Sequence, residues 1–182
     1  MEAVGYDLYC KMLNEAVKHL KGEMEEEDYT TTIDLNIDAY IPDTYISNEY
    51  QKLDIYKRIA AIESEEEMED MVEELIDRFG DIPKKVEMLL TVAQLKALAH
   101  KVYVTAVEQK GDTYTFAMYE RAKVCPEKIP ALLKEFRDDL AFKAEPPTFI
   151  YRKKRINKRD KTESALEVVK NVLIGIKGLL GN

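Results

Sequence analysis

The sequence has no tryptophan and only two histidines and two cysteines among its 182 residues. Nucleophilic catalysis needs a serine or cysteine beside a histidine that a third group orients. His19 and His100 instead lie on predicted amphipathic helices and have no such neighbours in the sequence. Cys10 and Cys125 are far apart, with no cysteine or histidine at metal-ligand spacing. We interpret them as structural thiols of a protein in a reducing cytoplasm.

Glycine is also scarce, with seven residues, and no glycine-rich phosphate-binding loop occurs. Such loops let backbone N–H groups approach an anion, so the sequence predicts no nucleotide and no other cofactor. No run of roughly 18 apolar residues could span a membrane, and the first four residues do not resemble a signal peptide. Because a helical pattern begins almost at once, we expect a fragment of a longer protein.

Carboxylates are abundant, and they are the groups that could form a metal site. Asp34, Asn36 and Asp38 alternate on one face of a predicted strand. Calcium needs six or more oxygens from a curved loop, and a straight strand presents too few. A solvated strand face is therefore the preferred interpretation, and we predict neither a metal site nor catalytic residues.

Charge is unevenly distributed along the chain. The net charge of −8 divides into −14 for residues 1–151 and +6 for residues 152–182. The acidic body repels phosphate, which argues against general binding of nucleic acid or anionic membrane. The basic segment 152–161 is the exception, and its candidate phosphate contacts are Arg152, Lys153, Lys154, Arg155, Lys158 and Arg159. A solvated turn, or a surface that pairs with the acidic body, is an equal alternative.

Hydrophobic periodicity predicts an α+β fold, with a small, mostly antiparallel sheet and a hairpin packed against several helices. Helices are expected over residues 6–21, 47–62, 64–79, 82–100, 126–137 and 162–180, and strands over 33–41, 102–108, 113–119, 140–142 and 148–152. Ser64 and Glu67 form a capping box, and Thr162 is expected to cap the last helix. In helix 64–79 the residues predicted to be buried are Met68, Met71, Val72, Leu75, Ile76 and Phe79.

Several segments resemble the C-terminal domain of bacterial transcription-repair coupling factors, the TRCF family. They are I-P-D-T-Y-I at 41–46, L-D-I-Y-K-R-I-A at 53–60 and E-E-L-I-D-R-F-G at 73–80, followed by Pro83. The opening V-G-Y-D-L-Y-C-K-M-L, residues 4–13, resembles the segment that follows the translocase module in the same proteins. This resemblance implies two parts: residues 1–28, an N-terminal helix and acidic connector from the preceding module, and residues 29–182, the regulatory domain.

The resemblance implies a non-catalytic role within an ATP-driven DNA translocase. The parent protein pushes stalled RNA polymerase along double-stranded DNA and recruits excision-repair enzymes, with its ATPase motifs outside this chain. The C-terminal domain acts as an autoinhibitory clamp on the N-terminal repair module of the same polypeptide. It thereby masks the site that recruits the damage-recognition subunit of nucleotide excision repair.

In this family the intramolecular contact is attributed to charged residues on the helix that ends in R-F-G, which implies Glu74, Asp77 and Arg78 as interface residues. Their spacing of i, i+3 and i+4 independently places them on one helix face, and an ordinary solvated face is the alternative. Two other functions stay open: a nucleic-acid-binding accessory domain that uses segment 152–161, and an enzyme with an unrecognised carboxylate or thiol site.

Overall fold

The computed structural model describes residues 29–152 and 164–180. The predicted helix 6–21 and most of the basic segment, residues 153–161, lie outside the described residues. The helices are α2 (Glu49–Ala60), α3 (Glu65–Phe79), α4 (Lys84–Lys101), the 3-10 helix η1 (Pro126–Lys128), α5 (Ile129–Glu135) and α6 (Ala165–Lys177). The strands are β1 (Thr32–Asp34), β2 (Val104–Lys110), β3 (Thr113–Met118), β4 (Leu140–Lys143) and β5 (Thr148–Arg152).

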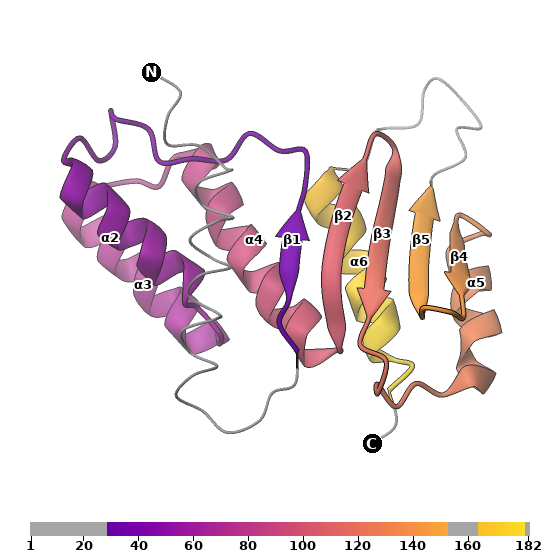
Figure 1. The fold of residues 1–182 in the computed structure, drawn as a ribbon. Coiled ribbons are helices and arrows are strands. Elements are labelled where there is room, and N and C mark those ends of the chain that lie inside the picture. Colours follow the sequence, from indigo (N-terminus) through magenta and orange to yellow (C-terminus); the bar gives the residue numbers. More distant parts are fainter. Residues whose placement is uncertain (1–28, 153–163, 181–182) are drawn as a thin grey trace. The chain divides into compact units, whose positions relative to one another are not determined.

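The chain divides into two compact units. The first unit is Met1–Thr32 with Ile37–Ala97, and the second is Ile33–Asn36 with Leu98–Asn182. In their described parts, the first unit holds α2, α3 and most of α4, and the second holds the sheet with α5 and α6 (Figure 1). These elements confirm the predicted α+β class.

Each of the first two helices starts at a side-chain cap. The Asn48 side chain accepts a hydrogen bond from the Gln51 N–H at 3.0 Å, and Ser64 Oγ accepts one from the Glu67 N–H at 3.1 Å. Such caps satisfy N–H groups that have no partner inside the helix. The Glu67 carboxylate completes the box one residue early, because it accepts from the N–H of Glu63.

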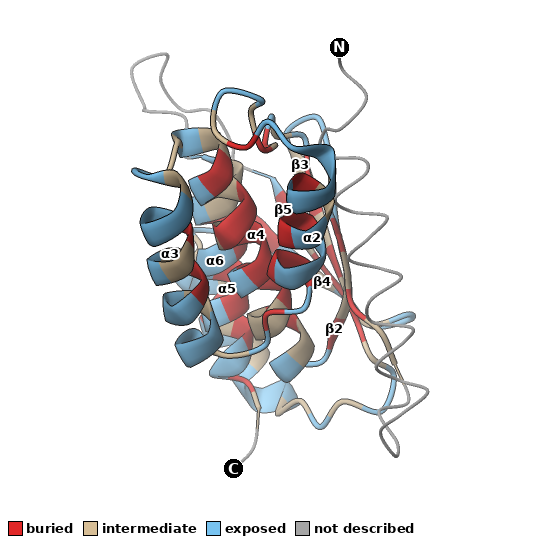
Figure 2. Cartoon of the chain, turned by 90° about the vertical axis from the view of Figure 1, so that its left-hand side faces the viewer, coloured by how far each residue is buried: buried red, intermediate tan, exposed pale blue. Residues whose placement is uncertain are grey.

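α4 is the most buried helix of the first unit, and Figure 2 shows it largely red where α3 is largely pale blue. Its buried apolar residues up to Ala97 are Val86, Leu89, Leu90, Val92, Ala93 and Leu95. They cover more than half of the circumference of the helix, and Lys84, Glu87 and Gln94 are exposed on the remaining side. α3 instead buries only Met71 and Leu75.

The segment before α2 is fixed by polar contacts from that helix and from α3. The backbone N–H of Ile41 donates to the hydroxyl of the buried Tyr56 at 2.8 Å. Lys52, which is 2% exposed, places its ammonium against the carboxylate of Asp43. The 41–46 segment is therefore an anchored turn rather than a free connector.

The second unit is built on a five-stranded sheet with the order β1-β2-β3-β5-β4. β2 with β3, β3 with β5 and β4 with β5 are antiparallel, whereas β1 and β2 run in the same direction in Figure 1. The turn between β2 and β3 contains Gly111 at φ +59°, a left-handed conformation that favours glycine.

α6 lies behind β2 and β3 in Figure 1 and buries Val168, Val169, Val172, Leu173 and Ile176. α5 and α6 approach closely at Gly175, where an added Cβ would lie 2.6 Å from Leu132 Cδ1. Glycine is the residue that permits this distance. The two helices and the sheet therefore form the core of the second unit.

Four details differ from the sequence predictions. The predicted strand 33–41 is hydrogen-bonded into the sheet only at its start, because β1 ends at Asp34. Residues along this segment still alternate in burial, since Ile33, Leu35, Ala39 and Ile41 are buried.

Ile76 is exposed rather than buried, and Met68, Val72 and Phe79 are only half-buried. Ser164 Oγ, and not Thr162, caps α6 by accepting from Glu167 N–H at 3.2 Å.

Candidate interaction surface on α3

The charged side chains at the two ends of α3 match its helix dipole. Glu65, Glu66 and Glu67 occupy its first turn and Arg78 its last. This arrangement places negative charge at the positive end of the helix dipole and positive charge at the other end. The inward stripe of the helix contains Met71 and Leu75, so the opposite side is left to solvent.

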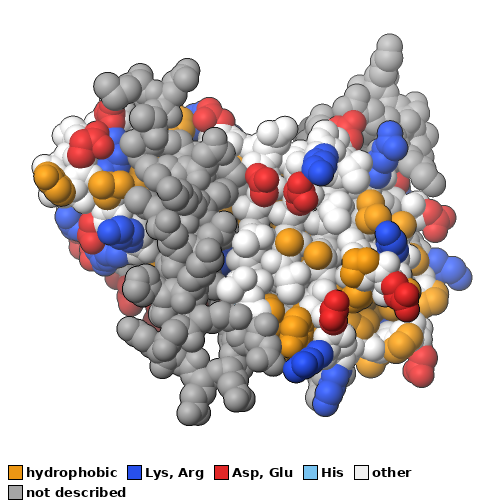
Figure 3. Space-filling model, viewed as in Figure 1, with side chains coloured by type: hydrophobic (Ala, Val, Ile, Leu, Met, Phe, Trp, Pro, Cys, Tyr) orange, Lys and Arg blue, Asp and Glu red, His pale blue; other side chains and the backbone are white. Residues whose placement is uncertain are grey.

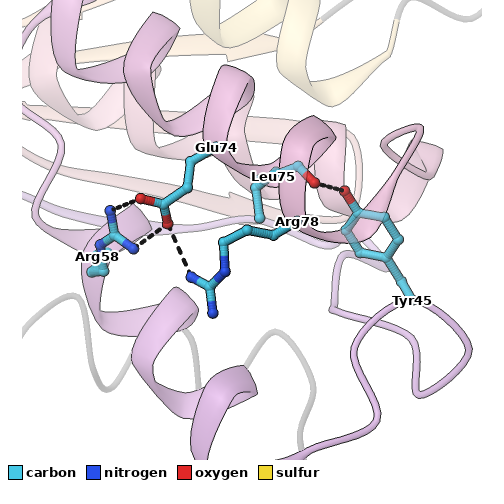
Figure 4. Close-up of polar contacts among 5 residues, drawn as sticks. All are labelled: Tyr45, Arg58, Glu74, Leu75 and Arg78. Carbon is cyan, nitrogen blue, oxygen red and sulfur yellow. Dashed lines mark hydrogen bonds and ion pairs between the residues drawn. The ribbon is translucent and has the colours of Figure 1, made fainter.

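Glu74 is the centre of a three-residue charge network, shown in Figure 4. Arg58 on α2 donates to both of its carboxylate oxygens, with Nη2 at 2.8 Å from Oε1 and Nη1 bonded to Oε2. From one turn further along α3, Arg78 Nη1 donates to Oε2 at 3.1 Å. Bidentate arginine–carboxylate pairs fix orientation as well as charge. Glu74 is therefore held in one position by two helices.

The network changes the protonation equilibria of its members. Hydrogen bonding from Arg58, aided by Arg78, holds the pKa of Glu74 below its ordinary value. The hydrogen bond from Glu74 likewise raises the pKa of Arg58. Both shifts favour the ionised pair, so the network is fully charged at neutral pH.

The end of α3 is fixed by Tyr45 from the anchored turn. Its hydroxyl lies 2.9 Å from the Gly80 carbonyl oxygen and 3.2 Å from that of Leu75, and it donates to them. Its ring lies 5.8 Å from the ring of Phe79, and the Arg78 guanidinium stands 4.8 Å over that same ring. Burial raises the pKa of Tyr45, with a contribution from Asp81. The hydroxyl thus remains a donor at neutral pH.

Asp77 has a different environment from Glu74 and Arg78, although all three were predicted to share a face. Its side chain is exposed, and no basic residue of the described chain lies within ion-pair distance. Glu69, Asp70, Glu73 and Ile76 are also exposed. We define these five residues, Glu69, Asp70, Glu73, Ile76 and Asp77, as the outer face of α3. The structure therefore brings Glu74 and Arg78 together and leaves Asp77 open to a partner.

The predicted phosphate contacts are described only at Arg152. It is exposed at the end of β5, and it faces Thr113 in the register with β3. Thr113 in turn faces Lys110 of β2. Lys153, Lys154, Arg155, Lys158 and Arg159 lie outside the described residues. Over the sheet, Figure 3 shows side chains of both charges scattered among apolar ones.

Within residues 29–152 and 164–180 no three of His, Cys, Asp and Glu come together as a metal site would require. Nor is any helix of the described chain long and apolar enough to span a membrane. One buried titratable group stands out: Lys96 on α4 is 8% exposed, and burial lowers its pKa to about 8.

Two residues that hold α3 in place, Arg58 and Tyr45, were missed by reasoning from the sequence. Arg58 lies 16 positions before Glu74 on another helix, and no spacing rule relates such positions. Tyr45 lies inside the I-P-D-T-Y-I segment, but its role depends on where α3 ends. Both contacts depend on how the first unit packs.

Comparison with known proteins agrees with this fold. The crystal structure of the C-terminal domain of a transcription-repair coupling factor superimposes with a TM-score of 0.61 at 27% identity, covering 83% of this chain and 92% of that chain. The fold is therefore that of the α+β C-terminal domain of such factors. The sequence model of the TRCF domain matches residues 35–129. The chain belongs to the TRCF domain family.

Two curated relatives, both transcription-repair-coupling factors, are similar to this chain in sequence. The transcription-repair-coupling factor of Bacillus subtilis (strain 168) is 36% identical over 182 residues, which are 98% of this chain but 15% of the relative. That of Staphylococcus haemolyticus is 41% identical over 124 residues, or 67% of this chain and 11% of the relative. The chain therefore spans only a small part of the length of the curated relatives it matches.

Proposed function

We propose that this chain is a non-catalytic regulatory domain of a transcription-coupled DNA repair translocase and acts as an autoinhibitory clamp. It binds the N-terminal repair module of the parent polypeptide and masks the site that recruits the damage-recognition subunit of nucleotide excision repair. The observation that carries this proposal is the charge network of α3. Arg58 and Arg78 hold Glu74 in place beside the exposed Asp77, which has no ion-pair partner among the described residues.

The network suits a switch because its side chains are ordered before any partner arrives. Ordering rotamer-rich side chains at an interface costs free energy, and pre-organisation reduces that cost. A clamp that is closed in 99% of molecules needs only about 3 kcal/mol in favour of the closed state. A few partly desolvated charge pairs can supply this amount.

The remaining assignments belong to the same proposal. Residues 29–182 form the regulatory domain, and residues 1–28 are the helix and acidic connector from the end of the translocase module. The ATP-hydrolysing motifs and the contacts with RNA polymerase and double-stranded DNA lie elsewhere in the parent protein. The site of action is the bacterial cytoplasm, where transcription and repair take place.

The test is calorimetric titration of this chain into the N-terminal repair module of the parent polypeptide at two salt concentrations. Both Glu74→Lys and Asp77→Lys are expected to abolish binding. Glu74→Lys breaks the pairs with Arg58 and Arg78, and Asp77→Lys places positive charge on the acidic outer face of α3. Glu127→Lys, an equal charge reversal on η1 of the second unit, serves as the matched control and should bind as the unaltered chain does. The proposal fails if the unaltered chain does not bind at either salt concentration.

A second candidate function is nucleic-acid binding through segment 152–161. The observation in its favour is the exposed Arg152, in register with Thr113 and Lys110 at one end of the sheet. Phosphate binding weakens steeply as salt rises. Fluorescence titration with duplex DNA should then show a steep salt dependence that is lost on neutralising Arg152, Lys153 and Lys154. Equal affinity for the neutralised chain would exclude this function.

A further inference from the structure

Ile76 is the large apolar side chain that the fold places on the outer face of α3. It is 47% exposed, although the helical pattern of the sequence predicts it in the core. Val72 and Phe79, at i−4 and i+3, are half-buried and share its flank of the helix. Together the three form an apolar stripe that runs from the core of the first unit to solvent.

A single exposed isoleucine is common on protein surfaces, so the surroundings of Ile76 decide its interpretation. Every other residue of the outer face is a carboxylate: Glu69, Asp70, Glu73 and Asp77. Arg58 and Arg78 lie with Glu74 on the other flank of α3. An apolar centre with a charged rim is the usual organisation of a protein–protein interface.

The rim also restricts the kind of partner. Four carboxylates on one helix face repel a phosphate backbone, so the outer face does not fit nucleic acid. A protein surface with basic side chains around an apolar socket is complementary in charge and in shape. The match covers only 15% of the Bacillus subtilis relative, so a parent protein of similar length has further modules, and we take one of them as the occupant.

We propose that Ile76 is the apolar anchor of the α3 interface and inserts into a basic-rimmed apolar socket on the N-terminal repair module. This inference rests on the proposed function and adds a residue and a partner chemistry to it. Glu74 then acts as a positioning residue, because its carboxylate is already satisfied by Arg58 and Arg78. Asp77 and Glu73 are left to pair with the basic rim.

The structure provides a matched control for this proposal. Ile174 on α6, in the second unit, is 51% exposed and is also an isoleucine in a helix. The experiment compares Ile76→Ser with Ile174→Ser by calorimetric titration into the N-terminal repair module. Ile76→Leu is the third variant, because it keeps the apolar volume. Circular dichroism melts of all three variants verify folding, which exposed substitutions should leave nearly unchanged.

Ile76→Ser is expected to weaken binding about tenfold or more, as the loss of a central anchor does. Ile174→Ser and Ile76→Leu should each bind within about threefold of the unaltered chain. If the unaltered chain binds and Ile76→Ser binds equally well, the role of Ile76 as an anchor is wrong, but the proposed autoinhibitory function is not affected. If Ile76→Ser has a lower melting temperature than the unaltered chain, the affinity of Ile76→Leu decides the question. A folded Ile76→Leu variant that no longer binds would overturn the role of Ile76 as an anchor. No binding by the unaltered chain overturns the proposed function itself.

Discussion

Arg58, in the last turn of α2, holds the carboxylate of Glu74 on α3 with both terminal nitrogens of its guanidinium. Arg78 adds a third hydrogen bond to the same carboxylate. The two arginines exceed the one carboxylate in charge, so the network presents net positive charge beside the acidic outer face of α3. This contrast gives the helix two differently charged flanks, and a partner must match both of them.

Removing Arg58 should cost little stability, because all three members of the network are partly exposed. We expect Arg58→Met to lower the free energy of unfolding by less than about 1 kcal/mol at pH 7. The pKa of Glu74 is lowered in the fold by Arg58. The pair therefore stabilises the protein above the ordinary carboxylate pKa, and this stabilisation is lost as the pH falls through the lowered value.

Urea unfolding at a series of pH values between neutral and acidic measures this effect. The difference between the unaltered chain and Arg58→Met should shrink steadily on acidification. Lys57→Met, the same charge change at the neighbouring exposed position of α2, is the control and should show no such trend. Identical pH profiles for the two variants would mean that the Arg58–Glu74 pair does not form in solution.

The Tyr45 hydroxyl should contribute measurably to the end of α3. Tyr45→Phe removes the donor to the Gly80 and Leu75 carbonyls but keeps the ring against Phe79. We expect a loss of about 1 kcal/mol in the free energy of unfolding, the usual net value of one hydrogen bond. Amide exchange in the last turn of α3 should accelerate. Tyr50→Phe, at a position 86% exposed, should change neither quantity.

Local signals predicted most of the elements because they act over a few residues. The Ser64 cap, the hairpin around Gly111, the helix end at Gly80 and the helix start at Pro83 are set by backbone sterics and nearby hydrogen bonds. Alternation over 33–41 predicted the inward side chains, of which Ile33, Leu35, Ala39 and Ile41 are buried and Ile37 is half-buried. It overstated the strand, because any extended chain against a core alternates in burial, whether or not another strand pairs with it.

Long-range relationships explain what the sequence left undetermined. Helical periodicity assigned Ile76 to the core, since Val72 and Phe79 lie beside it on the helix surface at i−4 and i+3. Only the packing of α3 in the first unit determines that the buried side of the helix, with Met71 and Leu75, ends before Ile76. The spacing of Glu74 and Arg78 predicted a shared face, whereas the contribution of Arg58 depends on the packing of α2 against α3.

The Lys52 side chain should stabilise the first unit more through its stem than through its charge. Lys52 is 2% exposed, yet its ammonium contacts the carboxylates of Asp43 and Glu49, both well exposed. Lys52→Ala should cost roughly 2 kcal/mol because it leaves a cavity where the methylenes packed. Lys52→Met fills that space and should cost less than half as much in chemical denaturation. Equal losses for the two variants would assign the stabilisation to the charge.

The buried Lys96 should make stability depend on alkaline pH. Burial lowers its pKa from 10.5 to about 8, and the charge of Glu63 offsets this only in part. Below pH 8 the fold must hold a poorly solvated ammonium, which costs on the order of 3 kcal/mol. Between pH 8 and 10.5 the unfolded chain binds the proton more tightly, so stability rises with pH as this cost disappears.

Lys96→Met should therefore unfold at higher denaturant than the unaltered chain at pH 7, because it removes the buried charge and keeps the volume. Its advantage should decline above pH 8 and vanish only above pH 10.5, where Lys96 of the unaltered chain is neutral in the folded and the unfolded state. Lys101→Met, at an exposed position in the last turn of the same helix, should show no advantage at any pH. Guanidinium unfolding from pH 7 to 10 measures the difference in free energy of unfolding between Lys96→Met and the unaltered chain. The contributions of other titrating groups are largely the same in the two proteins and cancel in this difference. A Lys96→Met variant that is less stable at pH 7 would show that the ammonium has a compensating partner in the folded protein.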